Sequence, residues 1–197
     1  MSLPEWQELK MPDAEVIYYP QFFSPSQSDL LFQDLLNMTP WQQDTITVFG
    51  KTHLQPRLTA FFADNDKVYK YSNITMSPHP FKGNLKQIKE RLESILGIEF
   101  TSCLANLYRD GQDSNGWHAD DEKSLGENPV IASVSFGDER KFNFKHRNNS
   151  SLKETLILEH GSLLVMKGKT QHFWLHQIPK TRKPVGKRIN LTFRIIQ

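Results

Sequence analysis

Cysteine is nearly absent from this sequence of 197 residues, and long apolar runs are absent altogether. The one cysteine, Cys103, excludes an intramolecular disulfide and a cysteine-rich zinc site. No apolar run approaches the roughly 20 residues of a membrane-spanning helix, and the N-terminal residues lack the basic and apolar regions of a secretory signal. We therefore expect an intracellular protein with no membrane partner, cytoplasmic if bacterial and nuclear if eukaryotic.

Acidic residues are scarce in the last third of the chain. Residues 141–197 contain 12 Lys and Arg but 2 Asp and Glu, whereas residues 1–140 contain 12 and 20. The net charge of +2 hides this division. Such an asymmetry indicates nucleic-acid binding. A solvated basic face gives the same pattern and is the simpler interpretation until motifs are considered.

The pattern of apolar residues predicts a mostly β protein with flanking helices (α+β), and the length favours one structural domain and a monomer. One helix begins at the capping box of Ser24 and Gln27 and ends before Pro40, and a second covers about residues 84–96. A hairpin is expected at Thr45–Phe62 around a turn at Gly50. Seven further short strands predict a sandwich, barrel or jelly roll, namely Phe100–Tyr108, Val130–Phe136, Lys141–His146, Glu154–Leu158, Ser162–Lys167, Phe173–His176 and Arg188–Ile196.

The last of these strands has two chemically different faces. Side chains alternate along a strand, so Arg188, Asn190, Thr192 and Arg194 share one face and the apolar residues between them share the other. If the polar face points into a barrel, its two guanidinium groups need anions, because an unpaired buried charge is costly. Few acids lie nearby in the sequence, which favours a bound anionic ligand.

The tripeptide His118-Ala119-Asp120 places an imidazole and a carboxylate on one face of an extended segment. A third ligand from a later histidine would complete the 2-His-1-carboxylate triad of non-haem Fe(II) sites. Spacing alone does not choose among the four candidates, which are His146, His160, His172 and His176. An open ferrous site needs an oxidisable cosubstrate, and a dicarboxylate such as 2-oxoglutarate would also supply an anion for the two arginines.

Several segments together resemble the AlkB-like Fe(II)/2-oxoglutarate dioxygenases, over roughly residues 45–196. They are Asn106-Leu107-Tyr108, His118-x-Asp120, Ile131–Gly137, His176-Gln177-Ile178-Pro179 and Arg188–Arg194. The resemblance implies a double-stranded β-helix, or jelly-roll, core in residues 81–197. Residues 1–80 would form an N-terminal extension and nucleotide-recognition lid, with a finger hairpin at about residues 45–62.

The same resemblance assigns roles to individual residues. It selects His176 as the last iron ligand beside His118 and Asp120. It implies that Arg188 binds the distal carboxylate of 2-oxoglutarate. Asn106, Tyr108 and Asn190 would assist in cosubstrate binding, and Arg194 would lie near the other carboxylate and orient the metal site. The implied cofactor is Fe(II), with 2-oxoglutarate and O2 as cosubstrates.

Matches outside the iron site imply that the substrate is an alkylated base in DNA. They also imply that the base is flipped out of a DNA duplex. Phe49, between Val48 and Gly50 and followed by Arg57, resembles an aromatic wedge that fills the gap left by an everted base. Tyr69 and Tyr71 resemble the lid, where Tyr71 would stack on the base. Asp121 and Glu122 resemble an acidic pair that suits a cationic base such as 1-methyladenine or 3-methylcytosine.

The expected reaction is therefore repair of alkylated double-stranded DNA by oxidative demethylation, with release of formaldehyde and succinate. Three alternatives stay open on the sequence alone. An RNA demethylase of the same family would not need the wedge at Phe49. A protein or small-molecule hydroxylase would keep the iron chemistry without affinity for nucleic acid. A non-catalytic nucleic-acid-binding jelly roll would not need His118 or Asp120.

Overall fold

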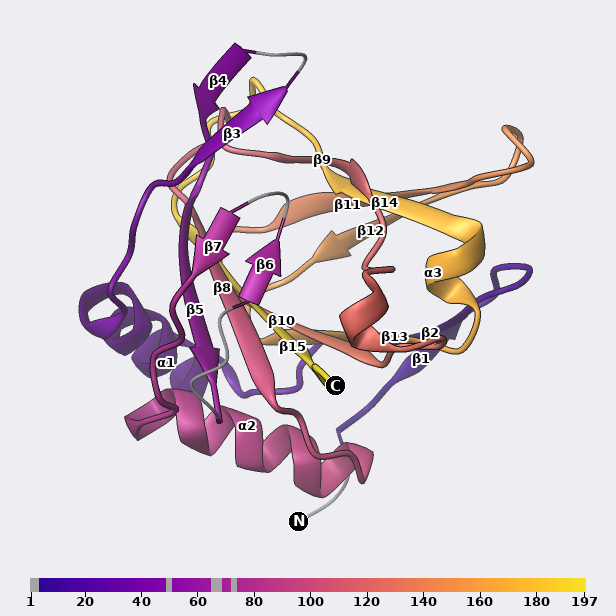
Figure 1. The fold of residues 1–197 in the computed structure, drawn as a ribbon. Helices are drawn as coiled ribbons and strands as arrows, with labels where there is room; N and C mark the ends of the chain where they lie inside the picture. The colour runs from indigo at the N-terminus through magenta and orange to yellow at the C-terminus, as the bar shows by residue number, and fades with distance from the viewer. Residues whose placement is uncertain (1–3, 49–50, 65–68, 72–73) are drawn as a thin grey trace.

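Two antiparallel sheets face each other in the computed structural model, which describes residues 4–48, 51–64, 69–71 and 74–197 (Figure 1). The large sheet has the strand order β1-β2-β13-β10-β15-β8-β5. Its strands are β1 (Gln7–Leu9), β2 (Glu15–Tyr19), β5 (Leu58–Ala63), β8 (Ser102–Tyr108), β10 (Ile131–Gly137), β13 (Ser162–Lys167) and β15 (Arg188–Arg194). This sheet supplies most of the residues that line the cavity described below.

The small sheet has the order β12-β11-β14-β9. It consists of β9 (Asn115–His118), β11 (Arg140–His146), β12 (Lys153–Leu158) and β14 (Trp174–Ile178). Two further hairpins stand apart from both sheets, β3 (Thr45–Val48) with β4 (Lys51–Leu54) and β6 (Tyr69–Tyr71) with β7 (Ile74–Met76). The predicted β-rich fold with a jelly-roll core is confirmed.

Helices α1 (Pro25–Met38) and α2 (Gly83–Leu96) cover the outer side of the large sheet (Figure 1). Both begin and end where the sequence predicts. The Ser24 and Gln27 capping box is formed at the start of α1, and Gly97 ends α2 in the left-handed conformation at φ 66°. No helix in the described part of the chain is long and apolar enough to cross a membrane.

The alternation of side chains along the central strands separates a dry core from the cavity. On β15, Ile189, Leu191 and Phe193 are fully buried and pack with Leu92 and Ile88 of α2 in one apolar cluster. The residues between them point to the space between the two sheets. A second apolar cluster, which includes Phe142, Phe144 and Trp174, lies on that inner side. The two-residue period of each strand thus places its polar residues beside the site and its apolar residues under the helices.

The segment Thr45–Phe62 differs from the single hairpin predicted for it. Thr45–Leu54 forms the hairpin β3–β4, but Leu58–Ala63 is strand β5 at the edge of the large sheet, paired with β8. The two parts of the segment differ in burial. Five of the six β5 residues are buried in the body of the protein, whereas residues 52–54 of the hairpin are exposed. Strands β1 and β2 also join the large sheet. Residues 1–80 therefore contribute three strands to the body of the protein.

Candidate metal centre

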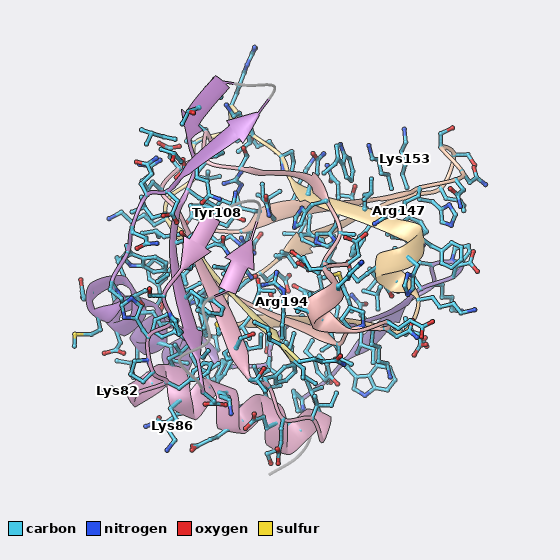
Figure 2. The ribbon with its side chains drawn as sticks, viewed as in Figure 1. Lys82, Lys86, Tyr108, Arg147, Lys153 and Arg194 are labelled. Carbon is cyan, nitrogen blue, oxygen red and sulfur yellow. The ribbon has the colours of Figure 1, made fainter. Side chains whose placement is uncertain are left out.

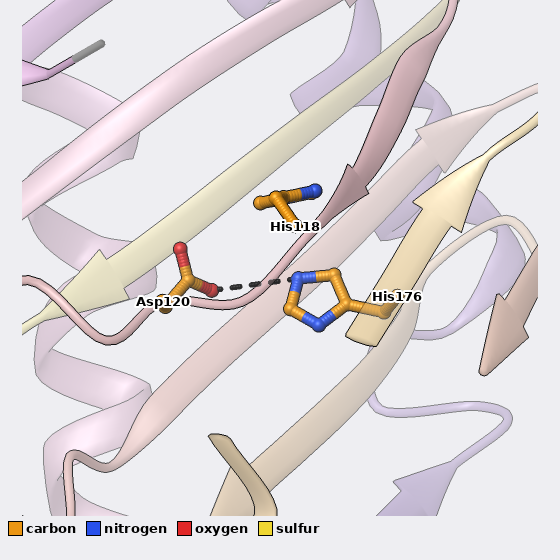
Figure 3. A group of neighbouring side chains, drawn as sticks. All are labelled: His118, Asp120 and His176. Carbon is orange, nitrogen blue, oxygen red and sulfur yellow. Dashed lines mark ion pairs between the residues drawn. The ribbon is translucent and has the colours of Figure 1, made fainter. Parts of the chain in front are cut away.

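Three side chains from two segments that are far apart in the sequence converge between the sheets (Figure 3). His118 ends β9 and His176 lies in the middle of β14, and these two residues face each other in the register of the β9–β14 pair. Asp120 follows β9 by two residues. One potential ligand atom from each residue lies within 4.8 Å of the others, and Nε2 of His176 is 3.6 Å from Oδ2 of Asp120. The structure thus brings together the three residues expected to hold iron.

The protonation of these groups favours metal binding. Burial alone raises the pKa of Asp120, but the Arg194 guanidinium, whose Nη2 donates to Oδ1 at 2.5 Å, brings it down to about 2. Burial lowers the pKa of His118, and it lowers the pKa of His176 to about 3. At neutral pH the site therefore offers two neutral imidazoles and one carboxylate, which is the state that coordinates a cation.

Neighbouring polar groups orient the three ligands. The backbone N–H of Asp120 donates to Oε1 of Gln171 at 2.9 Å. Nδ1 of His118 lies 2.8 Å from the carbonyl oxygen of Gly116, so this nitrogen carries the hydrogen in the arrangement that satisfies both atoms. Nε2 then has its lone pair available, and Asn115 Nδ2 lies 3.1 Å from it. Sequence reasoning missed both Gln171 and Asn115, because neither belongs to a metal-binding residue type.

The other candidate histidines have partners elsewhere. His146 lies 3.7 Å from Asp13, His160 lies 3.2 Å from Asp29, and His172 lies 3.2 Å from the side chain of Asn128. His172 and His176 are separated by the end of α3 (Thr170–Phe173) and the start of β14, so they face different surroundings. This geometry supports His176 over the alternatives that spacing left open.

A narrow cavity extends from the triad along the large sheet. It is lined by all the residues that the resemblance assigned to the cosubstrate, namely Asn106 and Tyr108 on β8 and Arg188, Asn190 and Arg194 on β15. Tyr108 and Arg194 lie within the body of the protein, whereas Arg147 and Lys153 lie toward its periphery (Figure 2). The sequence left the direction of the polar face of the last strand open, and in the described structure this face points inward.

Arg188 is a buried cation with hydrogen-bond donors that suit an anion. Its side chain is buried and its Nη2 donates to Ser135 Oγ at 2.9 Å. The guanidinium lies 5.1 Å from the centroid of the Tyr108 ring. Burial lowers its pKa to about 10, so it stays charged at neutral pH. Nε and Nη1 have no hydrogen-bond partner among the described residues, and two free donors on one planar group suit a carboxylate.

Serine residues of β10 support the polar face of β15. Asn190 Nδ2 donates to Ser133 Oγ at 2.7 Å, and Thr192 Oγ1 donates to Asn190 Oδ1 at 3.0 Å. Together with Ser135, which binds Arg188, they fix the side chains that face the cavity. The signal for these supports was present in the alternation of Ile131–Gly137, where each serine has an apolar neighbour. The donor set of the triad suits Fe(II), and the two free donors of Arg188 suit a carboxylate.

The residues predicted to touch nucleic acid have more varied positions. Arg57 is buried, and its Nε donates to Asn106 Oδ1 at 2.8 Å, so it lies beside the cosubstrate residues rather than on an open surface. Asp121 is half exposed and accepts from Arg147 Nη2 at 2.6 Å. Glu122 has a buried Oε2 with no hydrogen-bond partner among the described residues, and burial raises its pKa.

Some of the predicted substrate contacts involve residues or side chains that lie outside the described part of the structure. Phe49 and Gly50 lie outside the described residues. Val48 belongs to β3, and Tyr69 and Tyr71 belong to β6, but the side chains of all three are outside the described part of the chain. Their roles stay predictions.

The loop between β8 and β9, which leads into the triad, is held by one ion pair. Asp113 accepts from Nε and Nη2 of Arg109 at 2.8 and 2.9 Å, and from the backbone N–H of Arg109. Burial opposes ionisation of Asp113, but these bonds hold its pKa below the ordinary 3.8. Because the folded pKa is depressed, the stabilisation is present above the unfolded value and is lost as the pH falls through the folded value.

We expect Asp113→Asn to lower the free energy of unfolding by about 1.5–3 kcal/mol at pH 7, the usual range for hydrogen bonds to a charged group. The difference from the unsubstituted protein should shrink as the pH falls below 3.8. Urea denaturation at several pH values measures both. Asp110→Asn is the matched control, because Asp110 is exposed in the same loop and an amide oxygen can still accept from Gln112 N–H. A difference that does not change with pH would contradict this assignment.

Comparison with known proteins agrees with the geometry. The sequence profile of the 2OG-Fe(II) oxygenase superfamily matches residues 15–194. The chain is 40% identical over 192 residues to human alpha-ketoglutarate-dependent dioxygenase alkB homolog 3, covering 93% of this chain and 66% of that protein. It is 37% identical to the DNA oxidative demethylase ALKBH2 of Arabidopsis thaliana, covering 99% of this chain and 71% of that protein. For human ALKBH2 the identity is 34%, with coverages of 98% and 77%.

The solved structure of OsALKBH1 has the same fold, with a TM-score of 0.69 over 97% of this chain and 100% of that one, at 16% identity. The superfamily profile covers the triad, the cavity and both paired arginines. This chain therefore belongs to the 2OG-Fe(II) oxygenase superfamily, with Fe(II) as its metal and 2-oxoglutarate and O2 as its cosubstrates.

Proposed function

We propose that this protein repairs DNA by oxidative demethylation of N-alkylated bases such as 1-methyladenine and 3-methylcytosine. The observation that carries the proposal is the joint presence of the triad and the arginine-lined cavity in a chain 34–37% identical to relatives named DNA oxidative demethylase. The human alkB homolog 3 relative is longer than this chain, which spans 66% of its length. The substrate and compartment below are part of the proposal.

Bound Fe(II), with O2 and 2-oxoglutarate, supplies the oxidation that turns an N-methyl group into an N-hydroxymethyl group, while 2-oxoglutarate becomes succinate and CO2. His118, Asp120 and His176 would hold the metal. Arg194 donates to Asp120 Oδ1 and so keeps that carboxylate in one orientation. Arg188 offers its two free donors to the distal carboxylate. The N-hydroxymethyl group then breaks down to formaldehyde and the unmodified base.

Glu122 supports a substrate with positive charge. Its buried oxygen without a partner costs free energy in the substrate-free protein, and a cationic methylated base would offset that cost. Its neighbour Asp121 is already paired with Arg147, so of these two carboxylates Glu122 is the better candidate for the base. In this proposal the base is flipped out of a duplex, Tyr71 stacks on it, Tyr69 contacts the substrate, and Phe49 of the β3–β4 hairpin fills the gap.

The C-terminal basic residues would bind phosphates, so that affinity falls as salt rises. Lys153, which lies toward the periphery, is a candidate (Figure 2). An intracellular monomer, nuclear or cytoplasmic according to host, fits this proposal.

The deciding experiment supplies Fe(II), 2-oxoglutarate and O2 with single- and double-stranded DNA and RNA that carry one methylated base. We expect formaldehyde and the unmodified base from DNA, with duplex DNA the better substrate. Phe49→Ala should lower the rate on duplex DNA much more than on single-stranded DNA, because only the duplex leaves a gap to fill. An equal effect of Phe49→Ala on duplex and single-stranded DNA would contradict the role of Phe49 as a wedge. Product from RNA alone would assign the RNA demethylase, and no product from any nucleic acid would overturn the proposal.

A further inference from the structure

Arg140, the first residue of β11, is a buried cation that neither the triad nor the resemblance uses. The residue is 3% exposed, and burial lowers the pKa of its guanidinium while Tyr108, Asp113 and Asp110 oppose that effect. Within the described chain, no carboxylate lies within 4.0 Å of its guanidinium. The carboxylate of Asp113 is taken by Arg109, and that of Asp110 accepts from Gln112. The positive charge of Arg140 is therefore not cancelled by direct pairing.

Three backbone carbonyl groups accept the hydrogen bonds of Arg140 instead. Nη1 donates to the oxygen of Asp110 at 3.1 Å, and Nη2 donates to the oxygens of Asp113 and Pro179 at 2.9 and 2.7 Å. Asp110 and Asp113 belong to the loop that leads into β9 and His118, whereas Pro179 directly follows β14, the strand of His176. One guanidinium thus ties together the segments next to both iron-binding strands.

The same guanidinium reaches toward the cosubstrate end of the cavity. It lies 5.7 Å from the centroid of the Tyr108 ring, and the guanidinium of Arg188 lies 5.1 Å from that centroid. Tyr108 and Arg188 line the cavity. Arg140 instead lines an open groove with Pro179 and Lys141. It therefore stands behind Tyr108 and can act on the cosubstrate without touching it. The positive charge of Arg140 also contributes to the lowered pKa of Arg188.

We propose that Arg140 is a positioning residue for 2-oxoglutarate. It holds the Tyr108 ring against Arg188 through the clamped loop, and it adds a second positive charge behind the distal carboxylate. A dianion gains more from that charge than a monoanion does, because the energy scales with the product of the charges. This inference rests on the assignment of the cavity to 2-oxoglutarate and is independent of the nucleic-acid substrate.

The test measures binding to the full chain loaded with Mn(II), by calorimetry. The two probes are 2-oxoglutarate and 2-oxobutyrate, which share the oxo-acid group but differ in the distal carboxylate. We expect Arg140→Met to weaken 2-oxoglutarate binding about tenfold, the size expected for one charge across a protein interior, and 2-oxobutyrate binding less than about twofold on the same reasoning. Arg140→Lys should keep most of the affinity for 2-oxoglutarate but melt at a lower temperature, because an ammonium cannot bind the three carbonyls in the same way.

Lys141→Met is the matched control, since Lys141 is the exposed neighbour on β11, and it should change neither affinity. Unchanged 2-oxoglutarate binding in Arg140→Met overturns the proposal. Equal weakening of both probes also overturns it and leaves Arg140 as a clamp of the loop. If Arg140→Met does not fold, Arg140→Lys decides the question. Because Arg140→Lys keeps the positive charge, a tenfold loss of its affinity for 2-oxoglutarate would contradict the proposed role of that charge. These measurements report 2-oxoglutarate binding alone. They can therefore be interpreted even if the protein demethylates no nucleic acid.

Discussion

Replacing His176 by alanine is expected to abolish metal retention and turnover together. His176 supplies one of the three side-chain ligands, and its ring is fixed by stacking on Phe142 at 5.1 Å between centroids. Removal of a residue that merely orients a metal ligand already costs about 10- to 100-fold in affinity or activity. Loss of a ligand itself should therefore lower Fe(II) affinity by more than about a hundredfold. Decarboxylation of 2-oxoglutarate should fall below detection.

Metal content after dialysis and CO2 release from 2-oxoglutarate are the two measurements. His172→Ala provides the matched control, because His172 lies four residues earlier and its ring contacts Asn128 instead of the triad. That variant should keep its iron and its turnover. Circular dichroism separates loss of metal from loss of fold. A His176→Ala protein that keeps one equivalent of iron and normal turnover would show that the triad is assigned wrongly.

Arg188→Met is expected to raise the KM for 2-oxoglutarate by about a hundredfold, which corresponds to about 2.7 kcal/mol. The variant loses a bidentate, charge-assisted contact with the distal carboxylate. Metal retention should not change, because Arg188 does not contact the triad residues in the described structure. The metal-free variant should be at least as resistant to urea as the unsubstituted protein, since it no longer buries a cation with two unsatisfied donors.

Lys187→Met serves as the control for Arg188. Lys187 is the exposed neighbour in the chain, so its loss should leave the KM for 2-oxoglutarate unchanged. Arg188→Lys should give an intermediate KM, because an ammonium keeps the charge and loses the planar pair of donors. If 2-oxoglutarate binds Arg188→Met as tightly as the unsubstituted protein, the distal carboxylate lies elsewhere.

The sequence predicts those parts of the site in which local spacing determines which residues share a face. The two-residue period of a strand predicts that Arg188 and Arg194 share one face, and the structure shows that this face lines the cavity. His118 and Asp120 are close for the same reason. The choice of His176 did not follow from spacing, because it depends on which distant strand pairs with β9. Only the resemblance to a known family supplied that choice.

Contacts between distant segments account for what the sequence did not predict. Arg140 donates to carbonyl groups 27 and 39 positions away, and Gln171 accepts from a backbone N–H 51 positions away. No residue type marks a side chain for such a contact. Arg57 lies within the predicted hairpin and was assigned to the nucleic-acid substrate, but in the structure it directly precedes β5 and is buried next to Asn106. In each case tertiary pairing decided the position.

The pairing of β9 with β14 makes the metal part of the folding free energy. β9 is the edge strand of the small sheet and has β14 as its one neighbour there, and His118 and His176 are directly opposed across that pair. An ion held by both histidines cross-links this edge strand to the strand beside it. Since the unfolded chain keeps these ligands far apart, each tenfold rise of free Fe(II) above its dissociation constant adds about 1.4 kcal/mol to the resistance to unfolding. The ion that serves the reaction thus also stabilises the pairing of an edge strand with its neighbour.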